Sequence, residues 1–239
     1  MSGHSKWSKV KHQKATTDVV KAQAFTRASR AITIAVREGG GVTDPNHNFR
    51  LRLAVEKAHE VNMPKGNIER AIEKGASGGA GSIEQLQYEG YGPGGVALLV
   101  EAASDNKQRT VSAVKNVFDR FGGSLAVPGA VAYLFSRNGV LTVPKEGQPM
   151  EKILSLAIDS GADDVVEQAD MYEIYTTVPN LLRIKDALVG KGIPIDNTEI
   201  IMRPTTPVAL DDDKQRAIDV FVEALDELED VQKVFTNIA

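Results

Sequence analysis

The chain begins with lysines spaced two or three residues apart, ahead of its first acidic residue, and such a row can bind phosphate groups. These are Lys6, Lys9, Lys11 and Lys14, and the only tryptophan, Trp7, lies among them. An indole in this setting could stack on a base or a ribose. The alternative is a solvated N-terminal segment with Trp7 folded onto the first helix. Composition leaves both interpretations open.

A helix is predicted directly after this basic segment, over residues 17–38. A capping residue at 17 or 18 and three glycines at 39–41 bound it. Its apolar residues fall on one arc of the helix, whereas Arg27 and Arg30 fall on another. We therefore expect both arginines to join the basic segment in binding nucleic acid. The predicted nucleic-acid-binding residues are Lys6, Trp7, Lys9, Lys11, His12, Lys14, Arg27 and Arg30.

Two further helices are predicted to cover the apolar arc. The first begins at Asp44-Pro45-Asn46, and the second begins at Pro64, which suits a first helical turn, and ends at Gly75. Together they make a small, basic, all-helical domain. The sequence GASGGAGS at residues 75–82 is typical of a flexible linker and marks the end of that domain.

Charge is divided unevenly between the two parts of the chain. Residues 1–74 carry 14 Lys+Arg and 7 Asp+Glu, whereas residues 75–239 carry 14 and 25. Such asymmetry indicates a polyanion-binding domain joined to an acidic body. The net charge of −4 hides this division.

Composition also excludes several classes of protein. Because cysteine is absent, disulfides, thiolate metal sites and cysteine nucleophiles are excluded. No stretch is long and apolar enough for a membrane span, and the N-terminus lacks the apolar region of a signal peptide. We expect a cytoplasmic protein without a membrane partner.

Strands and helices alternate after residue 95. Residues 139–203 are predicted to follow the ferredoxin-like order strand, helix, strand, strand, helix, strand. The dipeptide Asn138-Gly139, at the start of this region, is typical of a hairpin turn. It is predicted to join a strand at 131–135 to a strand at 140–143. A second set of the same order remains: strand 96–101, helix 107–121, strands between 124 and 136, helix 211–228 and strand 231–236.

The simplest arrangement of these two sets places one domain inside the other. We predict an α+β multidomain fold, with an N-terminal all-helical domain followed by two ferredoxin-like α+β domains, one inserted into the other. The predicted boundaries are 1–78 for the basic helical domain, 79–136 plus 205–239 for the outer α+β domain, and 137–204 for the inserted one.

Two motifs could bind a ligand, but each has a simpler structural explanation. The glycine-rich stretch from Tyr91 to Val96 resembles a phosphate loop, yet it precedes a strand and lacks the P-loop lysine, which favours a tight turn. Residues 105–110 lie at a strand-to-helix junction, where Asn106 can cap the helix. Lys107 and Arg109 could bind an anion there.

The remaining acids and histidines do not form a recognisable catalytic or metal site. Residues 161–164 and 211–213 contain adjacent acids, but these positions fit a helix end and a helix start. The four histidines lack metal-ligand spacing, and no serine lies in a nucleophile elbow. We therefore predict no catalytic residues, no metal, no cofactor, no small-molecule substrate and no enzyme activity. The competing hypothesis is a small-molecule enzyme or sensor that uses the loop from Gly92 to Gly95 and the cleft between the α+β domains.

Several motifs together resemble the YebC/PmpR family over essentially the whole chain. They are Gly3-His4-Ser5-Lys6-Trp7, Asn62-Met63-Pro64-Lys65, Ile68-Glu69-Arg70-Ala71-Ile72, Tyr88-Glu89-Gly90-Tyr91-Gly92-Pro93-Gly94-Gly95-Val96, Asp105-Asn106 with Arg109-Thr110, Gly161-Ala162-Asp163-Asp164-Val165 and Asp230-Val231-Gln232-Lys233-Val234.

The resemblance implies a helical N-terminal domain and two α+β domains, one nested in the other. Members of that family are described as probable transcriptional regulators that bind DNA, and mitochondrial relatives are similar to translational activators that act at the ribosome. We therefore expect a non-enzymatic nucleic-acid-binding regulator of gene expression, a DNA-binding transcriptional regulator. A ribosome-associated translation factor that binds RNA is the alternative.

Overall fold

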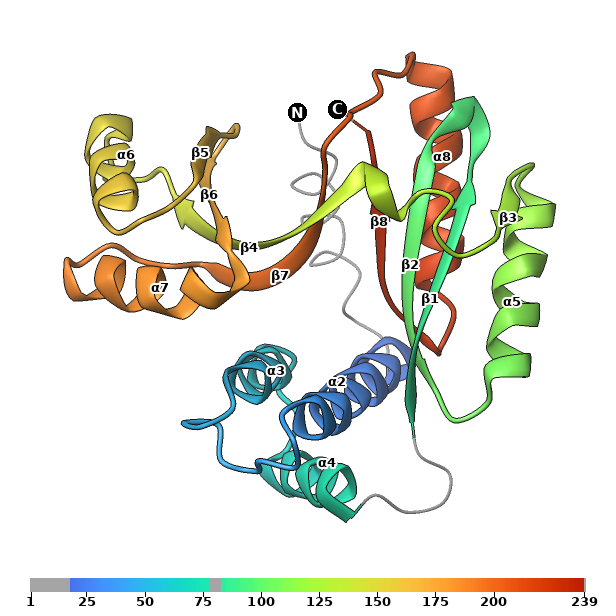
Figure 1. Cartoon of the computed structure of the whole chain (residues 1–239), viewed down its shortest axis with the longest axis horizontal. Helices are drawn as coiled ribbons and strands as arrows, with labels where there is room; N and C mark the ends of the chain where they lie inside the picture. Colours follow the sequence, from blue (N-terminus) through green and yellow to red (C-terminus); the bar gives the residue numbers. More distant parts are fainter. Residues whose placement is uncertain (1–17, 78–82, 239) are drawn as a thin grey trace. The chain divides into compact units, whose positions relative to one another are not determined.

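A computed structural model describes residues 18–77 and 83–238 of the chain (Figure 1). It divides into two compact units. One is formed by Phe135–Thr205, and the other by the described residues on either side of that segment. The sequence predicts an insertion over 137–204, which lies within one or two residues of these limits. None of the described helices is long and apolar enough to cross a membrane.

Three helices form the N-terminal part: α2 (Asp18–Glu38), α3 (Phe49–Glu60) and α4 (Lys65–Ser77). Ala28, Ile32, Ala35 and Val36 of the predicted apolar arc of α2 are buried, and α2 contacts both other helices. Gly75 allows α4 to approach α2 closely, because a Cβ atom there would lie 2.7 Å from Val36 Cβ and 2.9 Å from the Thr33 carbonyl oxygen. The buried set is Ala28, Ile32, Ala35, Val36, Leu51, Ala58, Met63, Ile68 and Ala71.

Helix α3 begins at Phe49, so the predicted start at Asp44-Pro45-Asn46 is wrong. The Asn48 side chain accepts a hydrogen bond from the Leu51 N–H at 3.1 Å and is therefore the N-cap. The same side chain donates to the Ala35 carbonyl oxygen at 2.9 Å, which fixes the cap against α2. Asp44 instead accepts from the Asn46 N–H in a turn before the helix.

The outer α+β unit contains a four-stranded antiparallel sheet of order β3-β1-β2-β8. The elements are β1 (Glu84–Tyr91), β2 (Ala97–Ser104), α5 (Lys107–Arg120), β3 (Ser124–Ala126), α8 (Asp212–Asp226) and β8 (Val231–Thr236). The predicted element order was wrong here, because β1 was missed. The predicted strand at 131–135 was also wrong: the 3₁₀ turn η2 (Ala132–Leu134) precedes the strand that starts at Phe135.

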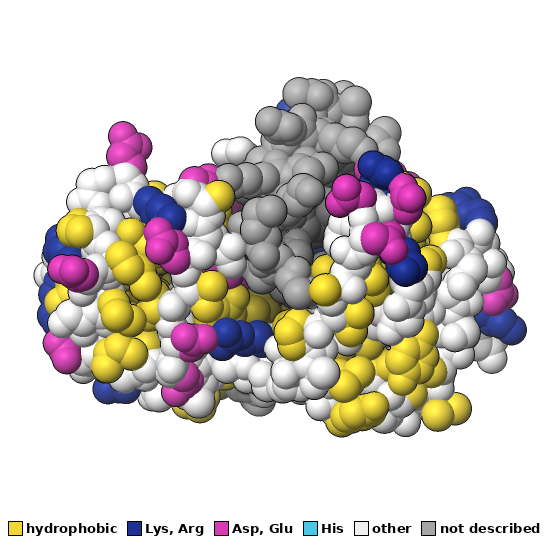
Figure 2. All heavy atoms as spheres, turned by 90° about the horizontal axis from the view of Figure 1, so that it is seen from above, with side chains coloured by type: hydrophobic (Ala, Val, Ile, Leu, Met, Phe, Trp, Pro, Cys, Tyr) yellow, Lys and Arg dark blue, Asp and Glu magenta, His cyan; other side chains and the backbone are white. Residues whose placement is uncertain are grey.

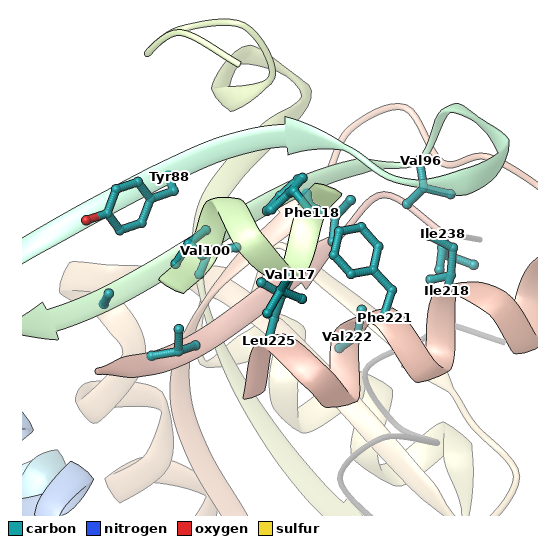
Figure 3. Close-up of a cluster of buried hydrophobic side chains, with 14 residues drawn as sticks. Tyr88, Val96, Val100, Val117, Phe118, Ile218, Phe221, Val222, Leu225 and Ile238 are labelled. Atoms are coloured by element: carbon teal, nitrogen blue, oxygen red, sulfur yellow. The ribbon is translucent and has the colours of Figure 1, made fainter. Parts of the chain in front are cut away.

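The core of this unit lies between the sheet and helices α5 and α8. Phe118 of α5 meets Phe221 of α8 edge to face, with ring centroids 5.0 Å apart (Figure 3). Val100 of β2 packs into the same cluster. Gly90 of β1 is required for this packing, because a Cβ atom there would lie 2.3 Å from Phe118 Cε1.

The inserted unit has the ferredoxin-like order that the sequence predicts, with sheet order β5-β6-β4-β7. Its elements are β4 (Phe135–Pro144), α6 (Met150–Asp159), β5 (Asp164–Glu167), β6 (Met171–Thr177), α7 (Leu181–Gly190) and β7 (Asn197–Pro204). Asn138-Gly139 forms no hairpin but lies inside β4, where Asn138 pairs with both Thr177 and Ile201. Partners on both sides keep β4 extended through this dipeptide.

Candidate nucleic-acid interface

Only two of the predicted nucleic-acid-binding residues, Arg27 and Arg30, belong to the described part of the chain. Both lie on α2, one helical turn apart. The other six, Lys6, Trp7, Lys9, Lys11, His12 and Lys14, fall outside the described residues. Their predicted contacts with nucleic acid therefore stay predictions.

Arg30 is paired with two carboxylates of the same chain. Its Nη1 lies 2.8 Å from Asp230 Oδ1, and its Nη2 lies 3.0 Å from Glu229 Oε1. Nη1 also donates to the Glu229 carbonyl oxygen at 2.7 Å. The Arg30 side chain is 11% exposed and that of Asp230 is 9% exposed, so this ion pair is largely withdrawn from water.

Arg27 contacts the same region one turn earlier. Its Nη1 lies 3.6 Å from Asp226 Oδ1, and its Nη2 donates to the Leu228 carbonyl oxygen at 3.4 Å. We name residues 226–230, from the last residue of α8 to the start of β8, the acidic loop. The two arginines thus fasten α2 to the acidic loop.

Asp230 is the centre of a wider hydrogen-bonded group. Its Oδ2 accepts from Thr110 Oγ1 at 2.7 Å and from Ser104 Oγ at 3.0 Å, and Arg109 Nη2 donates to Oδ1 at 3.0 Å. Burial raises the pKa of the Asp230 carboxyl, but these hydrogen bonds and the Arg30 charge outweigh it, so the net pKa is lowered. Asp230 is therefore held as a carboxylate.

These contacts differ from the expectation that Arg27 and Arg30 face a phosphate backbone. Each guanidinium already has a carboxylate partner, so we leave both out of the proposed nucleic-acid surface. Sequence reasoning missed the acidic loop as their partner. Two features of the sequence could have indicated this pairing: the concentration of acidic residues at 223–230 and their opposite charge to the arginines of α2.

Exposed lysines remain on the helical part after these pairs are formed. Lys21 of α2 and Lys74 of α4 are exposed, and no carboxylate among residues 21–77 and 83–238 pairs with either. Lys65 is 86% exposed and lies 3.7 Å from Glu69 in a surface ion pair of little strength. These cations could contact phosphates without breaking a buried pair.

The other sequence motifs are structural. The Tyr91–Val96 stretch is the turn between β1 and β2, with the Gly92 N–H donating to the Val96 carbonyl oxygen at 2.8 Å. Asn106 caps α5 by accepting from the Arg109 N–H at 3.0 Å. Asp211 caps α8 in the same way, through the Lys214 N–H.

A cavity of about 170 Å³ adjoins the acidic loop, lined by Arg109, Thr110, Ala113, Leu228, Glu229 and Asp230. Its polar groups are the ones already engaged around Asp230. Across the described segments, His, Asp and Glu form no group that could hold a metal ion. The arrangement around Asp230 is therefore that of a structural junction.

Comparison with known proteins places the chain in a family. Residues 5–78 match the TACO1/YebC protein N-terminal domain, and residues 83–238 match the TACO1/YebC second and third domain. The chain belongs to the TACO1/YebC family. The resemblance inferred from the sequence motifs is thereby confirmed, and the boundary between the two TACO1/YebC matches falls in the glycine-rich linker.

Relatives of this TACO1/YebC chain extend over its full length. A protein of Chloroflexus aggregans is 46% identical over 241 residues, covering 100% of this chain and 95% of the relative. One of Acidothermus cellulolyticus is 44% identical, covering 99% and 96%. Both are named "Probable transcriptional regulatory protein". The crystal structure of a conserved hypothetical protein from Aquifex aeolicus matches with a TM-score of 0.84 and 40% identity, covering 95% of this chain and 93% of that one.

Proposed function

We propose that this protein is a non-enzymatic, cytoplasmic regulator of gene expression that binds DNA and regulates transcription. The observation that carries this proposal is the division of charge between the basic first 74 residues and the acidic remainder. Four lysines directly precede α2, and α2 is fastened to the acidic loop through Arg27 and Arg30. A basic segment adjoining an anchored helix is suited to phosphate contacts.

The state of two of the buried carboxylates, Asp230 and Glu89, supports a non-enzymatic role. Asp230 and Glu89 both have a lowered pKa, and in each the hydrogen bonds that lower it come from the chain itself. A general acid or base would instead need a pKa near the working pH and access to a substrate. These two carboxylates stabilise the fold.

Charge reversal in the basic segment tests this function. We expect Lys9→Glu with Lys11→Glu in the full chain to weaken binding to duplex DNA of several sequences alike, because phosphate contacts carry no sequence information. Each lost contact should flatten the log–log salt dependence of binding by about 0.9. Fluorescence anisotropy over a salt series measures both effects.

Lys191→Glu is the matched control, since Lys191 is exposed in the inserted unit outside the basic N-terminal part. It should leave affinity and salt dependence unchanged. Unchanged affinity of the Lys9/Lys11 variant at low salt would reject the proposed role of the basic segment.

A ribosome-associated translation factor that binds RNA is the second candidate, and the surface of α4 favours it. Arg70 of α4 donates to the Gly66 carbonyl oxygen and to Asn67, while Glu69 and Glu73 are exposed beside it. A helix with these features is poorly suited to reading bases in the DNA major groove. Co-sedimentation with ribosomes in a sucrose gradient would favour the RNA ligand, and crosslinking with sequencing of bound nucleic acid would identify it.

A further inference from the structure

The outer sheet has a second face, opposite to the one that α5 and α8 cover. Leu98, Val100 and Ala102 of β2 belong to the core cluster shared with α5 and α8 (Figure 3). Successive side chains of a strand point to opposite faces, so Leu99 points to the second face. Phe235 of β8 pairs directly with Leu99 and therefore shares that face. The second face thus carries a large apolar pair on β2 and the edge strand β8.

This pair is buried, which distinguishes it from the hydrophobic side chains of the surface. Leu99 is 0% exposed and Phe235 is 2% exposed. Hydrophobic side chains appear at several places on the face of the molecule shown in Figure 2, as on most folded proteins, so exposure alone would single out no docking position. A buried aromatic ring on an edge strand instead requires a segment that packs over it.

One described segment lies on the second face at β1. Glu89 of β1 is in register with Leu99, so the two share this face. The Glu89 carboxylate accepts three backbone N–H groups of residues 129–132 at 2.8 to 2.9 Å, which holds that segment over β1. Phe235 lies two strands away from Glu89 in the sheet, or about 10 Å.

Helix α2 is fastened at the far end of strands β2 and β8. Arg30 of α2 pairs with Asp230, whose carbonyl oxygen accepts the Ala103 N–H at 2.8 Å. Ala103 is four residues from Leu99 along β2, or about 13 Å. Helix α2 begins at Asp18, about 18 Å along the helix from Arg30. The anchors of both segments are thus away from the apolar pair, and the N-terminal segment joins the fold close to it.

Residues 1–17 are long enough to reach Phe235 and carry a ring that suits it. An extended chain spans about 3.3 Å per residue, so the stretch from Trp7 to Asp18 spans up to about 36 Å, which exceeds each of the distances above. Trp7 is the only tryptophan, tyrosine or phenylalanine of this segment. Packing an indole on a phenylalanine ring removes a large apolar area from water and permits a favourable aromatic geometry.

We propose that residues 1–17 dock on the second face of the outer sheet, with the Trp7 ring packed against Phe235. This position differs from both interpretations of the sequence, which place Trp7 on a base or on the first helix. The docking itself needs no nucleic acid. Its consequence rests on the proposed function: a segment held at Trp7 loses less conformational entropy when Lys9 and Lys11 contact phosphates, so binding is stronger.

The single tryptophan and the absence of cysteine allow a direct test in the full chain. Lys233 lies on the second face, and its Nζ is 5.9 Å from the centre of the Phe235 ring. A nitroxide label on Lys233→Cys, which quenches indole fluorescence only at short range, should remove most of the Trp7 emission. The matched control is the same label on Val220→Cys, an exposed position of α8, which covers the opposite face. That label should leave the emission unchanged.

Equal quenching by the two labels, or no quenching by the label on Lys233→Cys, would reject the docking. In the unlabelled parent, we expect Trp7 emission at shorter wavelength than that of N-acetyltryptophanamide, with several-fold weaker quenching by acrylamide. Emission and quenching equal to those of the free indole would also reject it.

Phe235→Ala removes the ring that Trp7 contacts in this arrangement. The Trp7 emission should move to longer wavelength, and its quenching by acrylamide should rise several-fold. Val234→Ala is the matched control, because Val234 lies in the same strand but packs against the cluster on the opposite face. It should leave Trp7 as protected as in the parent. Circular dichroism verifies that both variants fold, and the nitroxide measurement tests the docking with Phe235 intact.

Nucleic-acid binding separates this inference from the proposed function. Trp7→Ala should weaken binding to duplex DNA by about twofold to tenfold with an unchanged salt slope, because it removes no phosphate contact. If Trp7 is unprotected and Lys9→Glu with Lys11→Glu still weakens binding, the proposed function stands and the docking is rejected. If Trp7 is protected in a chain that binds no nucleic acid, the docking stands and the proposed function fails. Protection of Trp7 only after a single-stranded ligand is added would reject the docking and assign the ring to a base.

Discussion

At the scale of single residues, two buried carboxylates organise segments that are distant in the sequence. Glu89 accepts hydrogen bonds from three backbone N–H groups, those of Gly129, Val131 and Ala132. Asp230 accepts hydrogen bonds from two hydroxyl groups and forms ion pairs with two guanidinium groups. In both, burial alone would raise the pKa, and the hydrogen bonds reverse the shift. Each residue stabilises the folded chain in its ionised form.

Glu89→Gln removes that charge with little change of shape. A Gln amide has one acceptor oxygen and places an NH₂ group against a backbone N–H, so at neutral pH we expect a loss of about 1–3 kcal/mol in the free energy of unfolding. Urea denaturation followed by circular dichroism measures the loss. Glu84→Gln, at an exposed position of the same strand, is the control and should cost nothing measurable.

The same pair of proteins gives a pH test. A carboxyl whose pKa is lowered by folding contributes stability that is complete above its ordinary pKa and is lost as the pH falls through the lowered value. The stability difference between the parent and Glu89→Gln should therefore shrink between about pH 5 and about pH 2. A difference that stays constant over this range would contradict the assignment of the ionised form to Glu89.

At the scale of elements, the helical part depends on the close crossing of α2 and α4. Its packing follows from the sequence pattern, since an apolar arc of α2 is predicted and its central residues, from Ala28 to Val36, are in the buried cluster. The role of Gly75 was not predictable, because a glycine in the last turns of a helix could equally be a C-cap. In the structure its missing side chain leaves room for Val36 and the Thr33 carbonyl oxygen.

Gly75→Ala should destabilise the helical part by about 1–3 kcal/mol, because the new methyl group would overlap backbone and Cβ atoms of α2. Gly66→Ala in the same helix is the matched control. A Cβ atom at position 66 meets nothing within 4 Å, so this change should be neutral or stabilise by up to about 1 kcal/mol through helix propensity. Thermal unfolding followed at 222 nm compares the two. Equal effects would argue against the close crossing.

Strands were harder to predict than helices. The strand β1 was missed because its polar residues alternate with few apolar ones and its last residues merge with the glycine-rich turn. Asn138-Gly139 was misread as a hairpin because the dipeptide signal is local. The strands that keep it extended come from residues 171–204, far along the chain.

At the scale of the whole molecule, the pairing of α2 with the acidic loop is the feature that the sequence could not reveal. Arg30 and Glu229 are separated by 199 positions, and charge patterning along a chain does not identify such partners. The charge division between the first 74 residues and the rest was visible in the sequence. The attraction between the two parts at this junction could be identified only from the folded chain.

Asp230→Ala should be the most damaging single change at this junction. It leaves Arg30 largely buried without its closest carboxylate, and it also unpairs Ser104 and Thr110, so we expect a loss of about 3–5 kcal/mol in the free energy of unfolding. Guanidinium denaturation measures it. Glu227→Ala, an exposed acid of the same loop, should cost less than about 0.5 kcal/mol. Similar losses in both variants would show that Asp230 has no special part in the junction.

The nesting of one domain in another sets the order in which the molecule can mature during synthesis. Helix α8 and strand β8, which complete the core and the sheet of the outer unit, are synthesised only after Phe135–Thr205. Until then Val100 and Phe118 lack their Phe221 neighbour. The inserted unit is therefore synthesised in full before the outer unit, and the core of the outer unit is completed only after residues 212–236 have been added.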